Sequence, residues 1–332
     1  VILLISGMEY YQIYLCLTLK PLWIPLRNIK SNIMKEEFYN YIRNLQLSIT
    51  RELEKVDGKS KFSNIKWKRE GGGGGVTKII ENGNIFQKGG VNISNVFGEL
   101  PKTMKDYLNT KYSLFSACGL SLVIHPKSPL IPTVHSNLRY FELYNKSNVV
   151  VDQWFGGGID LTPYYIDNFD INHFHKVCKI SCDEHDKNYY NIFKKNCDNY
   201  FWNKHREEAR GVGGIFFDYL KPDGKSVNEL YDFVTSVGDN FLNSYLPIVK
   251  KNKNVSYSDK QKKWQEVRRG RYVEFNLLHD KGTQFGIKTN GRIESIFMSL
   301  PPTVRWEYNF QPKKNSSESE LLGVLKKPKE WI

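Results

Sequence analysis

Four arginines gather in one stretch of the chain, RRGRYVEFNLLHDKGTQFGIKTNGRIES, which spans residues 268 to 295. Within it, Val273, Phe275 and Leu277 alternate with other residues, and this period of two indicates a half-buried strand. Gly, Asp and Asn further along favour turns, so the stretch predicts two strands joined as a hairpin. Arginine can hold a carboxylate through two parallel hydrogen bonds. We therefore expect either a site for a ligand with several carboxylates or a hairpin whose basic face only meets solvent.

One carboxylate, Asp160, follows the three glycines Gly156 to Gly158. This spacing predicts a tight turn at a strand end, where an acid can point into a cleft. A helix N-cap or an Asx turn is the alternative role for Asp160.

The histidines and cysteines could form a metal site, because both are common ligands of zinc and other transition metals. His173 and His175 form an HxH pair, with Cys178 and Cys182 one helical turn apart behind it. Positions two apart on a helix face different directions, which argues against a site built from that pair. A looser site and a structural role for each histidine both stay open; the histidines concerned are His125, His135, His175 and His205.

Other motifs exclude several classes of protein. The run Gly71 to Gly75 lacks the Lys-Ser/Thr end of a phosphate-binding loop, so a mobile flap or a close backbone approach to a ligand is favoured. No GxSxG elbow and no GxGxxG fingerprint is present, which leaves acyl hydrolase and nicotinamide chemistry without support. The aromatic residues do not form an RNA-binding pattern, so we expect no nucleic-acid partner.

The composition predicts a globular protein with an anionic partner. The 332 residues are 40% hydrophobic, and the net charge is +13 with a pI near 9.3. Five cysteines without a CxxC pair favour a reducing compartment over a disulfide framework. The apolar start VILLISG is interrupted by Glu9, Gln12 and Lys20, so we expect no stable membrane insertion.

The patterns along the chain predict a single α+β domain. Apolar residues repeat at helical spacing from Phe38 to Leu53 and again, as one longer run, from Val227 to Val249. Short connections between the strand candidates favour antiparallel pairing; these candidates are residues 120–125, 138–143, 149–155 and 212–220. We expect residues 1–33 to be an N-terminal extension of unknown role and residues 34–332 to form this domain.

Five blocks of the sequence together resemble the oxygen-dependent coproporphyrinogen III oxidase family. They are SLVIHPKSPLIPTVHSNLRYFEL, WFGGGIDLTPYY, NKHREEARGVGGIFFDYL, RRGRYVEFNLL and GRIESIFMSLPPTVRWEY. The resemblance implies a large, flat, mainly antiparallel sheet with helices on both faces, in a homodimer. It also implies oxidative decarboxylation of two propionates of coproporphyrinogen III to vinyl groups, which gives protoporphyrinogen IX, carbon dioxide and hydrogen peroxide in haem biosynthesis.

The resemblance implies roles for particular residues. His135 is the expected proton donor, and Asp160 is the expected acid that meets the pyrrole N–H groups. Oxygen is the co-substrate, no organic cofactor is implied, and a divalent metal held by the four histidines is possible but not essential. Substrate contacts carry over to Ser121, Asn137, Leu138, Arg139, Asp280, Lys281, Asn290, Gly291 and Arg292.

Two positions depart from the family pattern. Lys281 stands where an arginine is usual, which keeps the charge but loses the planar fork. Tyr219 replaces an acid, so no role that needs two adjacent carboxylates carries over to Asp218 and its neighbour.

Two other functions stay open on the sequence alone. One is a tetrapyrrole carrier without turnover, and the other is a histidine-metal oxygenase or hydrolase. For the compartment we expect the cytoplasm, with the mitochondrial intermembrane space as the alternative.

Overall fold

The computed structural model describes residues 33–288 and 292–332. The strands are β1 (Ser63–Lys68), β2 (Gly73–Glu81), β3 (Phe86–Glu99), β4 (Leu114–Pro126), β5 (Thr133–Tyr144), β6 (Val150–Thr162), β7 (Trp202–Asn203), β8 (Glu208–Ala209) and β9 (Gly213–Leu220). The helices are α1 (Ile33–Asp57), α2 (Lys102–Leu108), α3 (Asn168–Asp183), α4 (Tyr189–Tyr200), α5 (Val227–Asp239), α6 (Phe241–Asn252), α7 (Asp259–Leu278), α8 (Lys281–Lys288), α9 (Ile293–Phe297) and α10 (Ser317–Lys326).

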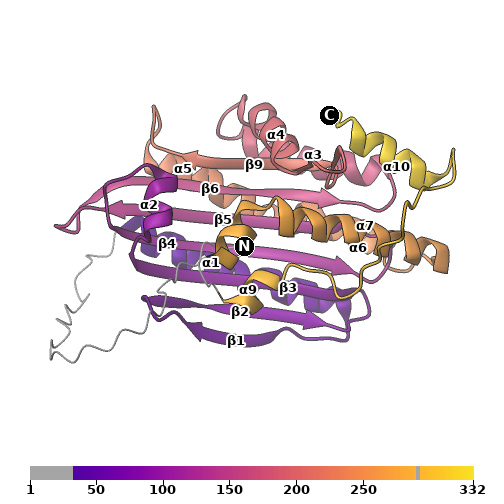
Figure 1. Ribbon diagram of the computed structural model, residues 1–332, viewed down its shortest axis with the longest axis horizontal. Helices are drawn as coiled ribbons and strands as arrows, with labels where there is room; N and C mark the ends of the chain where they lie inside the picture. Colours follow the sequence, from indigo (N-terminus) through magenta and orange to yellow (C-terminus); the bar gives the residue numbers. More distant parts are fainter. Residues whose placement is uncertain (1–32, 289–291) are drawn as a thin grey trace.

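One large sheet organises the molecule (Figure 1). Its strand order is β1-β2-β3-β4-β5-β6-β9, and every neighbouring pair is antiparallel. The first six strands follow one another along the chain, and β9 joins the edge after α3, α4 and the small β7–β8 hairpin. The predicted α+β fold with a large antiparallel sheet is confirmed, and all four strand candidates lie in this sheet.

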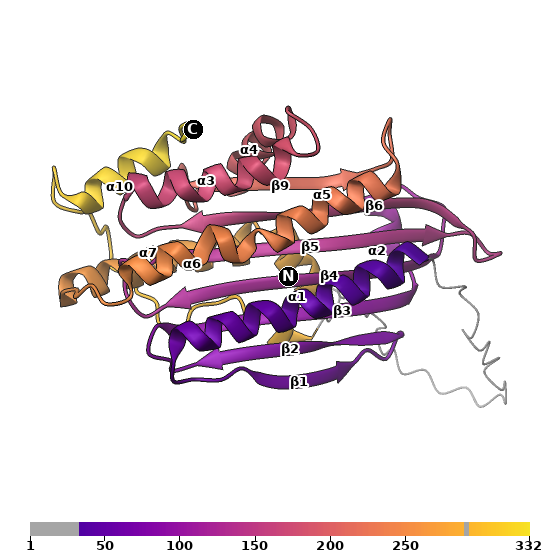
Figure 2. The ribbon, with the colours of Figure 1, turned by 180° about the vertical axis from the view of Figure 1, so that it is seen from behind.

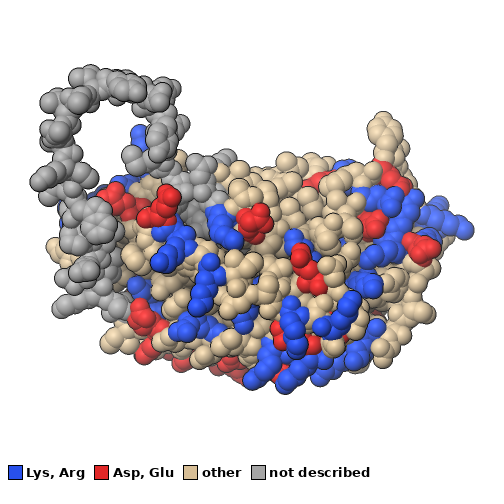
Figure 3. Space-filling model, turned by 90° about the horizontal axis from the view of Figure 1, so that it is seen from below, with Lys and Arg blue, Asp and Glu red and all other residues tan. Residues whose placement is uncertain are grey.

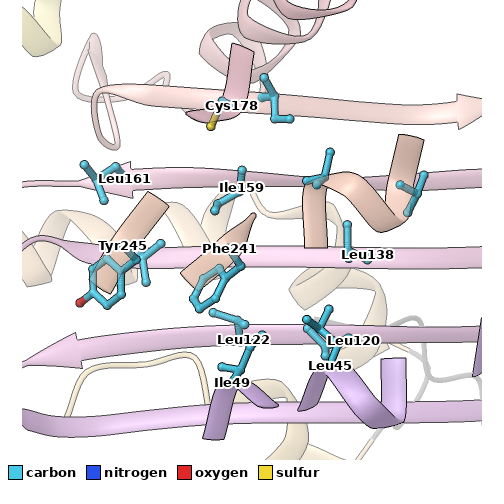
Figure 4. Packing of buried hydrophobic residues seen from close by; sticks show 14 of the residues in the cluster. Leu45, Ile49, Leu120, Leu122, Leu138, Ile159, Leu161, Cys178, Phe241 and Tyr245 are labelled. Atoms are coloured by element: carbon cyan, nitrogen blue, oxygen red, sulfur yellow. The ribbon is translucent and has the colours of Figure 1, made fainter. Parts of the chain in front are cut away.

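The main hydrophobic core lies on one face of the sheet, under α1, α3, α5 and α6 (Figure 2). Because successive residues of a strand point to opposite faces, Leu120 and Leu122 of β4 point into this core while Ser121 points away. Figure 4 shows them packed with Leu45 and Ile49 of α1. Each such side chain contributes about 1.5–3 kcal/mol on burial, so this layer fixes which face of each strand is left for other uses.

Helices α7 and α9 cross the opposite face of the sheet (Figure 1). Helix α7 begins with a capping box, in which the side chains of Ser258 and Gln261 bind each other's backbone N–H groups. With helices on both faces, the arrangement agrees with the expected layers.

The prediction that residues 268–295 form two strands is wrong, because α7, α8 and α9 occupy the described part of this stretch. In α7 the buried residues include Trp264, Arg268, Tyr272 and Phe275, which recur at helical spacing. Two arginines of the stretch are buried and Leu277 is 40% exposed. The apolar alternation on which the prediction rested therefore does not mark the buried face.

Two other segments differ in detail from their predictions. The predicted helix over residues 38–53 is confirmed as part of α1, whereas the run from Val227 to Val249 divides into α5 and α6 at Asn240. Asn240 binds Ser181 Oγ and the carbonyl of Ser236 through its side chain, which fixes the break. The glycines at 71–75 form the β1–β2 turn and the start of β2, packed closely against β1 and β3.

The basic residues are distributed over the surface that Figure 3 shows, among acidic side chains. The view is from the side of β1, an edge strand whose Lys66 and Lys68 are exposed. Lysines on an edge strand discourage pairing with another chain. Among residues 33–288 and 292–332, no helix is long and apolar enough to cross a membrane. The predicted extension over residues 1–33 lies outside the described residues except for Ile33, and it stays a prediction.

Candidate functional site

The register of β4, β5 and β6 brings five of the predicted site residues to one face of the sheet. Ser121 pairs with Asn137, His135 with Asp160, and Arg139 with Gly156. Residues paired across strands share a face, and residues two apart on one strand do so as well. These polar side chains therefore lie together opposite the hydrophobic core, on what we call the site face.

Leu138 does not belong to the site face. Its side chain is 1% exposed and packs in the hydrophobic core with Leu120 and Ile159 (Figure 4). The expected contact between substrate and the side chain of Leu138 therefore has no support in the structure.

A buried chain of three polar groups forms the centre of the site face. His135 Nδ1 lies 2.7 Å from Asp160 Oδ1, and Arg210 Nη2 donates to both oxygens of Asp160 at 2.8 and 2.7 Å. The side chains of Asp160 and Arg210 are each 2% exposed, whereas that of His135 is 18% exposed. Of the three, only His135 is open to a ligand, and Asp160 lies behind it. Asp160 is also part of β6, so the expected turn or helix cap at this position is wrong.

Arg210 follows the β7–β8 hairpin and was assigned no role from the sequence. Its guanidinium carbon lies 3.9 Å from the ring centroid of Phe201 and 5.0 Å from that of Phe275. An arginine enclosed by aromatic rings and paired with a carboxylate is held in one position. The one sequence signal for Arg210 was its place in a block that resembles the family. The spacing of residues along the chain does not show that Arg210 is the buried partner of Asp160.

The contacts favour an ionised Asp160 and a neutral His135. Burial alone would raise the pKa of Asp160, but the charge of Arg210 and the hydrogen bond to His135 hold it below its usual value. Burial lowers the pKa of His135 below 6.5, against the opposing effect of Asp160. Because the carboxylate can only accept, Nδ1 of His135 carries the proton and Nε2 keeps a free lone pair. His135 can therefore accept a proton at Nε2.

Arg139 lies on the same face of the sheet as His135 and Asp160. Its Nη2 forms an ion pair with Asp218 Oδ1 at 2.7 Å, and its Nη1 donates to Asn137 Oδ1 at 3.2 Å. The Arg139 and Asp218 side chains are 25% and 31% exposed, so this pair meets solvent. Arg139 is a cation that a ligand can reach.

The three arginines of α7 are engaged with protein groups, so they give no support to the carboxylate-binding alternative for their stretch. Arg268 forms a buried ion pair with Glu208 at 2.8 Å, and Arg269 donates to the carbonyl of Pro126 at 2.8 Å. Arg271 pairs with Glu274 at 3.0 Å. Arg268 and Arg269 therefore fasten α7 to the rest of the fold, whereas the Arg271 pair lies within the helix. Of the four arginines in this stretch, Arg292, which donates to Ser295 Oγ at the start of α9, remains the candidate for binding.

The structure gives Asp280 a structural role at the start of α8. Its carboxylate accepts hydrogen bonds from the Thr283 backbone N–H at 2.7 Å and from the Tyr200 hydroxyl at 2.9 Å. Lys281 is exposed next to it. Asn290 and Gly291, two further predicted contacts, lie outside the described residues.

The four candidate histidine ligands have separate protein partners. His125 binds Thr133 and the Ser299 carbonyl, and His175 binds Tyr190 and the Val212 carbonyl; burial lowers the pKa of His175 to about 3. His205 contacts Glu274 and His279. In the described parts of the chain, no group of three or more His, Cys, Asp or Glu side chains is placed to hold a metal ion.

Tyr219, the second departure from the family pattern, packs against an aromatic residue next to Asp218. Its ring stacks on Trp154 with centroids 5.3 Å apart. Its φ of 51° is unusual for a residue other than glycine, and its backbone N–H donates to Asp218 Oδ1 at 2.9 Å. Tyr219 therefore fixes Asp218 through its backbone.

Comparisons with known proteins agree with these observations. A family model described as Coproporphyrinogen III oxidase matches residues 37–331. The oxygen-dependent coproporphyrinogen-III oxidase, mitochondrial, of Rattus norvegicus is 47% identical over 309 residues, which cover 90% of this chain and 69% of the relative. Coproporphyrinogen-III oxidase 1, chloroplastic, of Arabidopsis thaliana is 44% identical, with 91% and 80% covered. The oxygen-dependent enzyme of Drosophila melanogaster is 46% identical, with 90% and 78% covered. The chain belongs to the coproporphyrinogen III oxidase family.

Proposed function

We propose that this chain is an oxygen-dependent oxidoreductase that converts coproporphyrinogen III to protoporphyrinogen IX in haem biosynthesis. Two propionates become vinyl groups, and each conversion releases carbon dioxide and passes two electrons to oxygen, which leaves as hydrogen peroxide. The observation that carries the proposal is the outward-facing His135, backed by Asp160 and Arg210, next to the accessible cation Arg139. This arrangement places a proton acceptor beside an anchor for a carboxylate.

His135 is the group that takes the pyrrole N–H proton in this proposal. Asp160 is 2% exposed and both its oxygens are engaged, so it acts on His135 rather than on the substrate. The ionised carboxylate orients the imidazole and stabilises the imidazolium that forms on proton transfer. Because the neutral His135 has its free lone pair at Nε2, it begins the reaction as a base and becomes the proton donor only afterwards.

Oxygen reacts with the tetrapyrrole itself once its N–H proton is removed, because the porphyrinogen is electron-rich. The proposal therefore includes oxygen as co-substrate, no organic cofactor, and no essential metal. The names of the relatives support the oxygen dependence.

Cations on the site face hold the propionates. Among the described residues, Arg139 and Arg292 are the arginines that we assign to this role, and each charge-assisted hydrogen bond contributes about 1.5–3 kcal/mol. Ser121 and Asn137 lie beside Arg139 on the same face of β4 and β5. Contacts from Lys281, Asn290 and Gly291 remain predictions of the resemblance.

Turnover with and without oxygen tests the proposed function. Chelator-treated protein is incubated with coproporphyrinogen III, and the oxidised products are separated by chromatography. We expect oxygen-dependent protoporphyrin through a tricarboxylic intermediate, and Asp160→Asn should lose at least about 100-fold in turnover while still binding porphyrin. Tight binding without turnover would indicate the carrier, and activity restored only by one added metal ion would indicate the histidine-metal enzyme.

The partners and compartment follow from the same proposal. The substrate is a tetra-anionic tetrapyrrole, and we infer a homodimer, which sedimentation would test. A cytoplasmic location remains our prediction, supported by four buried free cysteines at 118, 178, 182 and 197. The relatives of rat and Arabidopsis thaliana are named mitochondrial and chloroplastic, so fractionation of cells is the direct measurement.

A further inference from the structure

We propose that Asp218 is a positioning residue that occupies Arg139 in the free enzyme and gives it up to a propionate of the substrate. This inference rests on the proposed function. It adds a competing carboxylate, built into the fold, that sets how strongly the substrate is held.

The ion pair requires Arg139 to lie flat across the sheet. Arg139 is on β5 and Asp218 is on β9, with β6 between them. Gly156 of β6 makes this possible, because a Cβ atom there would lie 2.6 Å from Arg139 Nε and 2.8 Å from Asp218 Oδ1. The absence of a side chain at residue 156 thus lets the guanidinium cross one strand to reach the carboxylate.

Asp218 is held in place on its own side of the pair. The backbone N–H of Tyr219 donates to the same Oδ1 that Arg139 binds. The Tyr219 ring is fixed by stacking on Trp154, with 30° between the ring planes. Asp218 is therefore a fixed acceptor, and in an exchange Arg139 is the partner that moves.

The site face contains two Arg–Asp pairs that differ in burial. In the Arg210–Asp160 pair both side chains are 2% exposed, and aromatic rings enclose the guanidinium, so no ligand can compete with Asp160 for Arg210. The Arg139–Asp218 pair is 25% and 31% exposed. An ion pair that meets water is weak, so a substrate carboxylate can replace Asp218 at little cost. When the bound carboxylate leaves, Asp218 is in position to take Arg139 back.

The test is Asp218→Asn, which keeps an oxygen acceptor for Arg139 and for Tyr219 N–H but removes the competing charge. We expect KM for coproporphyrinogen III to fall by about two- to fivefold, without a rise in kcat, and the affinity for oxidised coproporphyrin III to rise by a similar factor. In an Arg139→Gln background the same change should leave porphyrin affinity unaltered, because the cation that mediates the effect is gone.

Two further variants make the result specific. Asp152→Asn is the matched control. The Asp152 side chain is 34% exposed and forms an ion pair with Lys221 at 2.6 Å, in which Arg139 takes no part. The KM of this variant should equal that of the wild type. Asp218→Glu keeps the charge and should not lower KM. The inference is overturned if Asp218→Asn raises KM, if Asp218→Glu lowers it equally, or if the effect persists without Arg139. Failure of the proposed function is distinct, because the wild-type protein would then form no protoporphyrinogen IX.

Discussion

The protonation states of His135 and Asp160 determine how the activity should depend on pH. The pKa of His135 lies below 6.5 because of burial, so the base is in its active neutral form at neutral pH and is lost only as the pH falls below 6.5. We expect kcat/KM to be level from about pH 8 to about pH 6.5 and to fall on the acid side. Stability should decline in the same window, because the unfolded chain takes up a proton on His135 at a higher pH than the native state does. A profile that rises as the pH falls would contradict a basic role for His135.

Arg210 is a buried side chain that, in our proposal, supports the site through Asp160 without touching the substrate. Replacing it by methionine in Arg210→Met leaves the carboxylate of Asp160, 2% exposed, with His135 as its remaining side-chain partner. Removing one partner of a buried ion pair costs about 3–5 kcal/mol, so the midpoint of urea denaturation should fall accordingly. The double variant Arg210→Met, Asp160→Asn should recover part of this loss. A single variant as stable as the wild type would show that the pair contributes little.

Lys281 is the position where a single change should improve binding. It is exposed at the first residue of α8, and arginine there would offer a carboxylate two parallel hydrogen bonds instead of one point charge. We expect Lys281→Arg to lower KM about two- to fivefold with kcat unchanged. Lys195→Arg, at an exposed lysine of α4, serves as the control and should change neither constant. An unchanged KM in Lys281→Arg would remove Lys281 from the binding site.

At the scale of elements, α7 is a support for the site rather than part of it. Arg269 is 1% exposed and donates to the Pro126 carbonyl, to Gln87 and to Thr303, which ties α7 to β4 and β3. Arg269→Met should therefore lower the free energy of unfolding by about 1–3 kcal/mol, measured by urea denaturation, with KM within about twofold of the wild type. Arg139→Gln, which changes an accessible arginine, should show the reverse pattern. If Arg269→Met raised KM as much as Arg139→Gln, α7 would have to bind substrate directly.

The sequence was informative about the strands and misleading about α7 for one physical reason. In β4, Leu120 and Leu122 point into the core and alternate with Gly119 and Ser121, so the pattern indicates a strand although both faces of β4 are buried. In α7, Arg268 and Arg269 are buried through ion pairs and hydrogen bonds, and Leu277 and Leu278 are exposed. A hydrophobicity scale treats arginine as a surface residue even where it is buried and paired. The hydrophobic pattern of residues 268–278 therefore could not indicate a helix.

At the scale of the whole molecule, the sheet places its main core and its polar site on opposite faces. One face carries the largest hydrophobic cluster, and the other holds His135, Asp160 and Arg139 in register on neighbouring strands, together with a smaller cluster that includes Phe141 and Trp154. The resemblance could identify these three from motifs on β5 and β6. It could not show that Arg210 and Asp218, which come from the later β8–β9 region, complete the two ion pairs. Such partners depend on the pairing of β9 with β6, which periodicity along the chain does not determine.

Removal of metal ions tests whether the fold and the activity need only the protein's own groups. Throughout the described residues, His125, His175 and His205 bind protein partners, and the four cysteines there are buried thiols. We expect exhaustive dialysis against a chelator to change Tm by less than about 2 °C, because no binding free energy of a metal is lost on removal. Turnover of coproporphyrinogen III should also be unchanged, and added zinc or copper should not increase it.

Variants His125→Gln and His175→Gln should lower Tm equally with and without chelator, since these histidines act through hydrogen bonds to Ser299 and Val212. A loss of Tm or turnover on dialysis that one metal ion restores would contradict this and locate a metal site in the assembled protein.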